Sequence, residues 1–434
     1  MPNRREARLS EAAASGDEDR ISALPDDILH LVLSSLPSDD AVRTCVLAKR
    51  WSHLWKSARA LRIYPRKSSS DVNASHRTWT WGPWTPQTLR IFVHHLLLLR
   101  GGAPLDVCDI ACGELWGESG GMKYEETNQT VGLWIRHAMM IGRARALRVC
   151  FRDGRRLCLD KTPFVSETLR TVELNDVTFY DKSVDFSSGD KRTRICTPRL
   201  VSLELSLCNG LAPFIPKKMS KLVTANVTLE GLCEDKCTHH GHNDSWLDSY
   251  SGSGNAAYLE SLPSCGICCG SNNHGASMLL EGLSVATTLE LISDARVFTF
   301  RKDCKLGTTF CNLKTLLLNE WCLADNFGAL VYFLRCSPIL QKLTVRIGNC
   351  ETRHPVVNRG DNYSPIEQSL VSNELKVVEI QCLQQNALVE KLITILVDYG
   401  VQREQINIEQ NLSPLSLSGY ETWSDDDEYY SDDY

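Results

Sequence analysis

The sequence has no long uninterrupted apolar run, and this argues against a membrane protein. The longest such stretch, at 91–99, is broken by His94 and His95. It is about half the length that a helix needs to cross a bilayer. The first twenty residues are charged and contain no apolar segment of the secretory type. We therefore expect an intracellular protein of the cytoplasm, the nucleus or both, with no membrane partner.

The sequence has neither the cysteine content of a disulfide scaffold nor a net positive charge. The 434 residues include 18 cysteines, a fraction well below the roughly 8–10% of a disulfide scaffold, so we expect reduced thiols. The net charge is −6, and residues 411–434 carry seven acids with no Lys or Arg. The rest of the chain is almost neutral, which argues against a nucleic-acid partner, because such a partner requires many phosphate contacts. We expect the acidic tail, 411–434, to be disordered.

Motifs of the common catalytic sites are missing. The sequence has no P-loop, no His-Glu-x-x-His and no Gly-x-Gly-x-x-Gly. We expect no catalytic residue and no cofactor. The segment 232–277 does combine Cys233, Cys237, Cys265 and Cys268 with several histidines, and these are zinc-ligand types. Their spacing matches no known finger, so we expect a polar insertion without metal. A metal site there is the alternative.

Residues 1–19 form a polar arm that we expect to be disordered. Residues 20–63 then carry the start and stop signals of three short helices. Pro25 suits a first helical position, because its missing N–H is not needed there, and two acids follow it in the first turn. Pro37 ends this helix, and Trp51 and Trp55 share one face of the third. A unit of about 44 residues is marginal alone. Its surplus apolar surface therefore needs a partner or the rest of the chain.

The segment ISALPDDILHLVLSSLPSDDAVRTCVLAKRWSHLWKSARALRI resembles an F-box of the plant type. The resemblance implies binding to a Skp-type adaptor within a Skp–cullin–F-box ubiquitin ligase. We expect the adaptor to bind the apolar and aromatic positions of the motif, which are Leu24, Pro25, Ile28, Leu29, Leu33, Leu36, Val42, Leu47, Trp51 and Trp55. Residues 64–86 are expected to be a linker.

A degenerate repeat follows the linker. Six segments fit the frame L-x-x-L-x-L of a leucine-rich repeat, and they start at Leu169, Leu200, Leu222, Leu313, Leu340 and Leu375. A single repeat cannot bury its own apolar face, so neighbouring repeats must stack. We predict a solenoid over 87–364, interrupted by the insertion 232–277.

Alternation along each strand assigns the side chains of these repeats. Residues of the frame point inward, and the residues between them point outward onto a continuous concave sheet. Such surfaces bind partners in solenoids, although an ordinary solvated face is the simpler alternative. The candidate target-binding residues are Thr171, Glu173, Ser202, Glu204, Thr224, Asn226, Lys342, Thr344 and Arg346.

The C-terminal part carries a second resemblance. Segments at 279–292, 311–323 and 373–409 are similar to plant F-box/leucine-rich-repeat proteins with an FBD-type C-terminal region. The pattern predicts a strand at 376–382, a helix at 387–399 that stops at Gly400, and a short strand with Ile406 and Ile408. We expect residues 365–410 to cap the solenoid.

Together these features predict an α/β protein in which a small three-helix F-box precedes a leucine-rich-repeat solenoid. The resemblance implies a substrate-recognition subunit. The F-box would bind the adaptor and through it a cullin-RING ligase, and the solenoid would bind a target protein. Catalysis would lie in the partner proteins. A scaffold that binds the adaptor without delivering a target, and a sensor of a small ligand, remain open alternatives. The sequence does not name the target.

Overall fold

The computed structural model describes residues 24–64, 66–67, 79–80, 85–112, 124–151, 157–159, 164–179, 193–210, 212–216, 218–233, 279–294, 297, 299–348 and 374–410. The chain divides into two compact units. The first contains 1–155 and 168–172, and the second contains 156–167 and 173–434. The predicted arm, most of the linker, the insertion from residue 234 and the acidic tail lie outside the described residues.

The first unit begins with the predicted helices. They are α2 (Asp26–Ser35), α3 (Ser38–Arg43), η1 (Thr44–Val46), α4 (Trp51–Leu54) and η2 (Trp55–Ser57). Pro25 and Pro37 are the N-cap residues of α2 and α3, and both have extended backbone angles. Each is followed by acids in the first turn, where the positive end of a helix favours negative charge. The expected three-helix arrangement is confirmed.

A parallel sheet continues the first unit. Strand β4 (Val107–Cys112) lies between β1 (Ala60–Ile63) and β5 (Ala146–Phe151). The longer helices are α5 (Pro86–Arg100) and α6 (Tyr124–Arg136), and α6 runs into a π-helical turn, η5 (His137–Ile141). A short antiparallel pair joins β2 (Arg66–Lys67) to β3 (Trp79–Thr80). Strand β1 starts inside the predicted F-box, so the last residues of that motif form the first strand of the sheet.

Local sequence explains where α5 begins and ends. The Thr85 side chain accepts from the Thr88 N–H at 3.3 Å, and the Thr88 hydroxyl accepts from the Thr85 N–H at 2.8 Å. This reciprocal pair satisfies donors that the first turn leaves free. Gly101 follows the last residue with a φ of 57°, which glycine adopts without strain.

The second unit is built on parallel strands in the order β11, β12, β13, β14, β15, β16, β17. They are β11 (Ser202–Gly210), β12 (Thr224–Cys233), β13 (Thr288–Ser293), β14 (Thr315–Asn319), β15 (Lys342–Ile347), β16 (Val377–Cys382) and β17 (Ile406–Glu409). Strand β8 (Thr171–Asn175) contains residues of both units. Short strand β9 (Val177–Phe179) pairs with β11 and with β6 (Leu157–Cys158), whereas β7 (Phe164–Val165) and β10 (Ile195–Cys196) form a separate parallel pair. The expected class, an F-box followed by stacked repeats, is confirmed.

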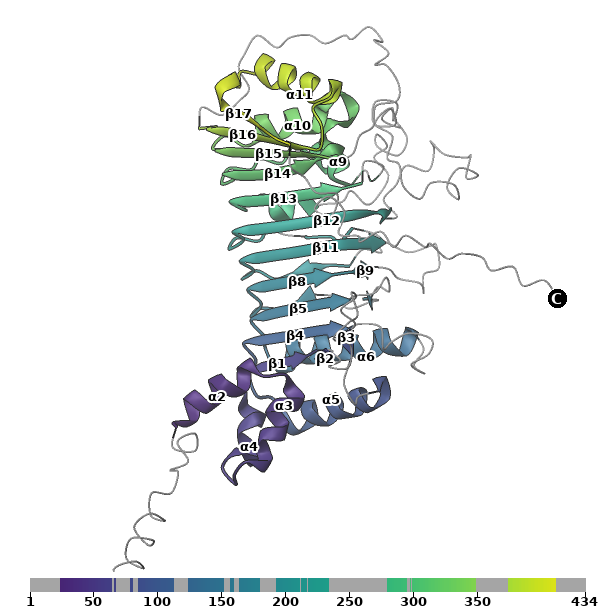
Figure 1. The fold of residues 1–434 in the computed structure, drawn as a ribbon, viewed down its shortest axis with the longest axis vertical. Coiled ribbons are helices and arrows are strands. Elements are labelled where there is room, and N and C mark those ends of the chain that lie inside the picture. The colour runs from purple at the N-terminus through teal and green to yellow at the C-terminus, as the bar shows by residue number, and fades with distance from the viewer. Residues whose placement is uncertain are drawn as a thin grey trace, which may run out of the picture. The chain divides into compact units, whose positions relative to one another are not determined.

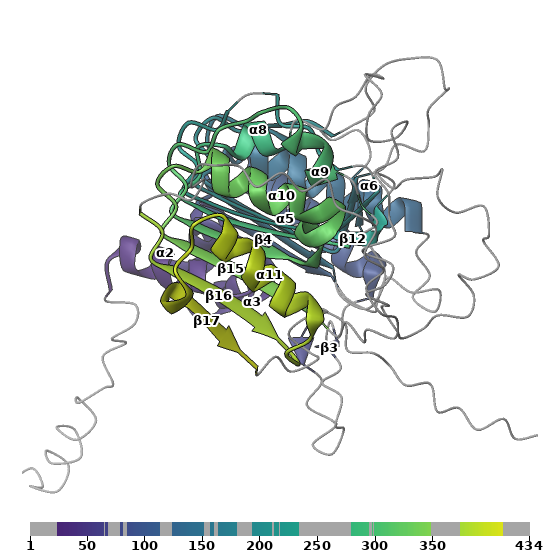
Figure 2. The same cartoon turned by 90° about the horizontal axis from the view of Figure 1, so that it is seen from above.

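The helices of the second unit lie on one face of its sheet (Figures 1 and 2). They are α8 (Leu279–Leu283), α9 (Thr299–Cys304), η7 (Glu320–Leu323), α10 (Ala324–Cys336), α11 (Ala387–Asp398) and η8 (Arg403–Gln405). Figure 1 looks onto the other face, which no described helix covers. We call it the open face and define it by the outward side chains of β11 to β17.

The same pair of backbone hydrogen bonds recurs just before the strands of successive repeats. The carbonyl of Lys314 accepts from the N–H groups of Gln341 and Lys342, and the carbonyl of Gln341 accepts from Lys376 and Val377. The frame residues then point away from the open face. Leu316, Leu343 and Val378 lie side by side in register and are fully buried. These layers form the core between the sheet and the helices.

The predicted C-terminal elements are present. Helix α11 and strands β16 and β17 match the expected ranges within one residue at each boundary that was predicted. The Asn386 side chain caps α11 by accepting from the N–H groups of Leu388 and Val389, both at 3.1 Å. Gly400 follows with a φ of 103°. Strand β13 was not among the six predicted repeats and adds one.

Candidate protein-binding surfaces

Four of the predicted adaptor positions lie in the interior of the first unit. Leu29 and Leu33 are 0% and 1% exposed, and Trp51 and Trp55 are 2% and 7% exposed. These side chains hold the helices together within this chain. They support a binding surface and do not form it. Among the other predicted positions, Leu24, Leu36 and Val42 are half-buried, whereas Pro25, Ile28 and Leu47 are exposed.

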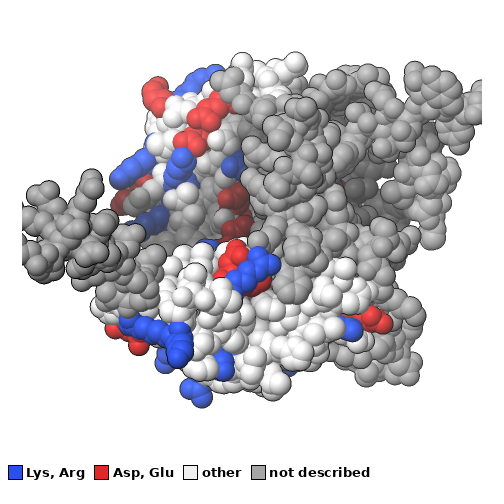
Figure 3. Space-filling model, turned by 60° about the horizontal axis from the view of Figure 1, so that its bottom comes forward, with Lys and Arg blue, Asp and Glu red and all other residues white. Residues whose placement is uncertain are grey.

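The F-box helices also expose large apolar side chains, which we call the apolar F-box surface. On α2 these are Ile28 (41% exposed), Leu31 (66%) and Val32 (43%), and at the end of η1 they are Val46 (82%) and Leu47 (65%). Figure 3, which brings this end of the first unit forward, shows a broad area with few charges. The predicted adaptor positions omitted Leu31, Val32 and Val46. Their signal was present, because a helix that is apolar around most of its circumference has more than one face to bury.

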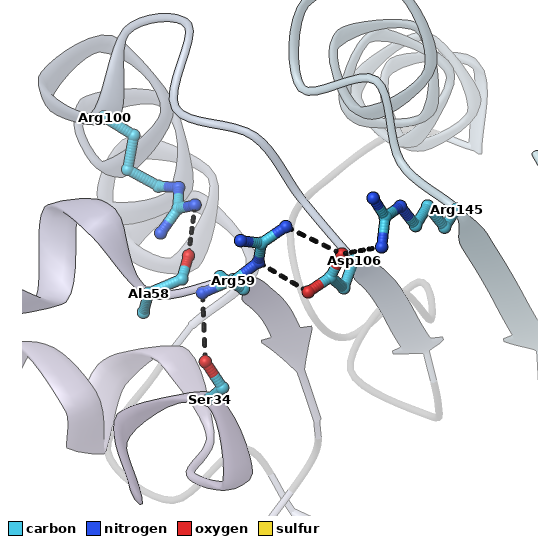
Figure 4. A network of polar contacts seen from close by, with 6 residues as sticks. All are labelled: Ser34, Ala58, Arg59, Arg100, Asp106 and Arg145. Carbon is cyan, nitrogen blue, oxygen red and sulfur yellow. Dashed lines mark hydrogen bonds and ion pairs between the residues drawn. The ribbon is translucent and has the colours of Figure 1, made fainter. Parts of the chain in front are cut away.

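A network of polar contacts joins these helices to the sheet of the first unit (Figure 4). The Arg59 guanidinium makes two contacts with the Asp106 carboxylate, at 2.6 and 3.1 Å, and Arg145 reaches the same carboxylate at 3.3 Å. The Arg59 N–H donates to the Ser34 hydroxyl of α2 at 3.0 Å. The hydrogen bond to Asp106 raises the pKa of Arg59. Arg59 therefore links helix α2 to the residue that precedes strand β4.

A buried cation of α5, Arg100, also contacts the end of the F-box helices. The Arg100 guanidinium donates to the backbone carbonyl of Trp55 at 3.1 Å and to that of Ala58. Its residue is only 8% exposed. Burial lowers the pKa of Arg100 to about 10, so the group stays charged at neutral pH. It satisfies carbonyl groups at the end of the last F-box helix, where a cation is favourable.

A third set of contacts ties β1 to both neighbours. The Arg62 guanidinium donates to the Ser34 carbonyl at 2.9 Å and lies 3.3 Å from the Asp109 carboxylate of β4. The Tyr64 hydroxyl donates to Asp109 at 2.5 Å. Burial, together with the bond to Asp109, raises the pKa of Tyr64. With these contacts, the F-box helices and the first strands form one body.

The second candidate surface is the open face. The Thr224 hydroxyl contacts the Ser202 hydroxyl at 2.9 Å, and Glu204, Asn226 and Glu290 follow one another in register on β11, β12 and β13. The predicted residues Thr171, Glu173, Ser202, Glu204, Thr224, Asn226, Lys342 and Arg346 are all half-buried. Those on β11, β12 and β15 belong to the open face.

Ion pairs cross the C-terminal strands of this face. The Lys342 ammonium lies 2.7 Å from Glu379, and Arg346 lies 3.2 Å from Glu290. Arg346 also donates to the Gln381 side chain at 3.0 Å. The candidate residues on β15 are therefore held by acids of β13 and β16, which the prediction did not include.

The expectation that Thr344 is exposed is wrong. Thr344 points outward but is only 4% exposed, and its hydroxyl donates to Glu379 at 3.3 Å. Its register neighbours are Leu317 and Glu379. Charged side chains of the adjacent positions, Lys342 and Arg346, reach across to acids on either side. Thr344 is therefore covered by its own strand's ion pairs.

Neither surface has the donor set of a metal site. Within the described ranges, no group of three or more His, Cys, Asp and Glu side chains is placed to hold a metal ion. The Cys/His insertion from residue 234 lies outside these ranges. Burial raises the pKa of the Cys108 thiol to about 12, which makes it a poor nucleophile at neutral pH. No helix of the described part is long and apolar enough to cross a membrane.

Comparison with known proteins finds the F-box and several relatives. Residues 21–62 match the F-box domain. An F-box/FBD/LRR-repeat protein of Arabidopsis thaliana is 29% identical over 221 residues, which cover 50% of this chain and 44% of the relative. An FBD-associated F-box protein of the same plant is 34% identical over 124 residues, covering 29% and 24%. An F-box/LRR-repeat protein of that plant is 39% identical over 82 residues, covering 19% and 17%. The matches thus span less than half the length of each relative.

Proposed function

The chain is an F-box/leucine-rich-repeat protein of the plant type with an FBD-type C-terminal region, and from this we propose that it is the substrate-recognition subunit of a Skp–cullin–F-box ubiquitin ligase. The F-box binds a Skp-type adaptor and through it a cullin-RING ligase. The repeats bind a target protein. The protein works in the cytoplasm, the nucleus or both, without a nucleic-acid or membrane partner.

The apolar F-box surface carries this proposal. Its five side chains are 41% to 82% exposed although they belong to short helices. Burying one such side chain contributes about 1.5–3 kcal/mol, so a partner that covers several of them gains enough to bind tightly. A partner with a matching apolar surface, and not a charged one, fits this part of the chain.

The mechanism is proximity, and this chain needs no catalytic residue for it. A receptor that holds a target beside a ubiquitin-conjugating enzyme raises the effective concentration of the target's lysines. Bond formation takes place in partner proteins. The contacts of Arg59, Arg62 and Arg100 support the mechanism, because they fix the F-box helices to the first strands. Motion of the F-box helices relative to the first strands would lower the effective concentration of the target's lysines.

Adaptor capture tests the proposal. The variant Val46→Glu with Leu47→Glu places two charges on the most exposed part of the apolar F-box surface. Losing two apolar contacts of this size corresponds to at least a 100-fold weaker affinity. The matched control is Leu306→Glu, because Leu306 is also exposed, at 48%, but lies in the second unit. Capture of a Skp-type adaptor by the double variant at the wild-type level would contradict the proposal.

Ubiquitination in the same system separates the alternatives. A receptor modifies its target only when both the apolar F-box surface and the repeats are intact. A scaffold captures the adaptor but supports no target modification under any condition. A sensor of a small ligand requires that ligand for target modification, so the low-molecular-weight fraction of a plant extract should restore modification and the dialysed extract should not.

A further inference from the structure

We propose that the open face of the second unit binds an extended, basic segment of the target that carries one aliphatic or aromatic anchor. This inference rests on the proposed function, in which the repeats hold a target protein. It adds the chemical class of the target segment and the strands that recognise it.

The charge of the open face is the first reason. Among the side chains that the structure describes on β11 to β17, the outward acids are Glu204, Glu290, Glu379 and Glu409, and the outward cations are Lys342 and Arg346. Both cations are already paired, Lys342 with Glu379 and Arg346 with Glu290. The face therefore keeps an excess of negative charge, and a basic partner is the complement.

The position of the excess charge is the second reason. Glu204 lies on β11, and the contact shown for it is with the neutral Ser206 hydroxyl at 3.3 Å. Asn226 separates Glu204 from Glu290 in register. Neighbouring strands are about 4.8 Å apart, so these two carboxylates are attached about 10 Å from each other. Glu290 is already paired with Arg346, so a Lys or Arg side chain over Asn226 would pair with Glu204.

An apolar spot is the third reason, and it is independent of the charge. Leu317 and Ile292 point outward on β14 and β13, and both are half-buried. Leu317 lies in register between Glu290 and Thr344. A solvated polar face gains nothing from leucine at this position. An aliphatic or aromatic side chain of a bound segment would cover it and gain the corresponding burial.

These positions fix a spacing. Leu317 on β14 is two strands from Asn226 on β12, a distance of about 10 Å. An extended chain advances about 3.3 Å per residue. A segment that crosses the strands therefore places its anchor and its basic residue three positions apart. An acidic segment, such as residues 411–434 of this chain with seven acids and no Lys or Arg, is repelled.

A random peptide library tests this inference. The full chain, purified with a Skp-type adaptor, selects binders from displayed 12-residue peptides, and the affinities of enriched peptides are measured by fluorescence anisotropy. We expect enrichment of Lys or Arg three positions from Leu, Ile or Phe. Affinity falls as salt is raised, because the charges are only partly buried.

Variants locate the binding. Glu204→Lys is expected to weaken the selected peptides at least tenfold, and Leu317→Ala severalfold. Glu204→Gln keeps the shape of the side chain and gives an intermediate loss if the reversal disturbs folding. The control is Asp398→Lys, because Asp398 is exposed at the end of α11 on the helical side. It leaves affinity unchanged.

Three results would overturn the inference. Enrichment of acidic or uncharged peptides contradicts the basic class. Affinity that is insensitive to Glu204→Lys, Glu204→Gln and Leu317→Ala contradicts the open face. A selection without any enriched peptide contradicts binding of an extended segment. Adaptor binding in the same preparations tests the proposed function separately, since a failure of the peptide selection leaves adaptor capture and target modification intact.

Discussion

The apolar F-box surface and the open face present opposite chemistry to a partner. The first exposes Leu31, Val46 and Leu47 without polar contacts between them. On the second, half-buried polar side chains contact one another across strands, as Lys342 does with Glu379. An apolar surface is non-directional and suits one constant partner. A polar surface is specific, since unmatched groups are costly to cover.

The repeat architecture explains how the two chemistries coexist in one chain. On each strand of the second unit, inward residues such as Leu343 form the core, and outward residues such as Lys342 take no part in it. Outward positions can therefore vary in chemistry without changing the fold. The F-box offers no such freedom, because Leu29 and Leu33 share a short helix with the exposed positions.

The largest expected effect tests this separation of inward and outward residues. Leu343→Ala removes a fully buried side chain and should lower the free energy of unfolding by about 2–5 kcal/mol. Lys342→Ala on the neighbouring outward position should change it by about 0.5 kcal/mol or less. Urea denaturation of both variants measures the two values. Equal losses would show that the outward residues are part of the core.

The next effect concerns the joint that holds the F-box helices. Arg100→Met keeps much of the apolar stem but leaves the carbonyls of Trp55 and Ala58 without their donor. Hydrogen bonds to charged groups contribute about 1.5–3 kcal/mol, and the loss should appear as faster hydrogen exchange in β1 and the F-box helices. Arg145→Met is the control, because its contact with Asp106 is exposed and worth about 1 kcal/mol at most. If hydrogen exchange is unchanged in Arg100→Met, apolar packing alone holds the F-box helices against the first strands.

Much of this fold could be predicted because local signals coincide with it. Pro25 and Pro37 begin helices, and Asn386 and Gly400 bound α11. The leucine frame located the strands where leucine is used. It missed β13, because Ala286 stands where the frame has its first leucine, although Ala286 is fully buried. The core requires an apolar residue of fitting size at that position and not leucine itself.

The parts that could not be predicted depend on contacts between distant residues. Alternation along β15 places Thr344 outward, but its hydroxyl contacts Glu379, 35 residues away in the sequence, and this contact helps to bury it. Likewise, the sequence shows that α2 is apolar on several sides. Which side is buried depends on β1 and α4, which pack against it from later in the chain. The candidate surfaces could therefore be named from the sequence, but not their exposed members.

A smaller effect sharpens the description of the open face. Arg346 and Glu290 form an ion pair in which both side chains are 28% exposed, whereas Lys342 in its pair with Glu379 is 44% exposed. Because solvent screens the more exposed pair, a double-mutant cycle to alanine should give about 1 kcal/mol for the first pair and about 0.5 kcal/mol or less for the second. Coupling of zero in both cycles would show that these cations are free to pair with an acidic target instead.

The smallest effect is a pH dependence at Glu320, just after β14. This carboxylate accepts from the Gly348 N–H, but burial, followed by the nearby Asp294, raises its pKa above the usual 4.5. The folded state therefore holds this proton more tightly than the unfolded state. The resulting stabilisation is complete below the unfolded pKa and is lost as the pH rises through the folded pKa.

Glu320→Gln has no such titration. The melting temperature of this variant relative to the wild type should therefore rise between pH 4 and neutral pH, while any constant cost of the amide shifts all points equally. Thermal denaturation at matched ionic strength measures the difference, and the slope with pH carries the result. A flat difference would mean that the bond from Gly348 offsets burial, because an acceptor that is as well solvated by the backbone as by water has an ordinary pKa. The end of β14 would then resemble the open face, where Glu290 and Glu379 contact cations of β15.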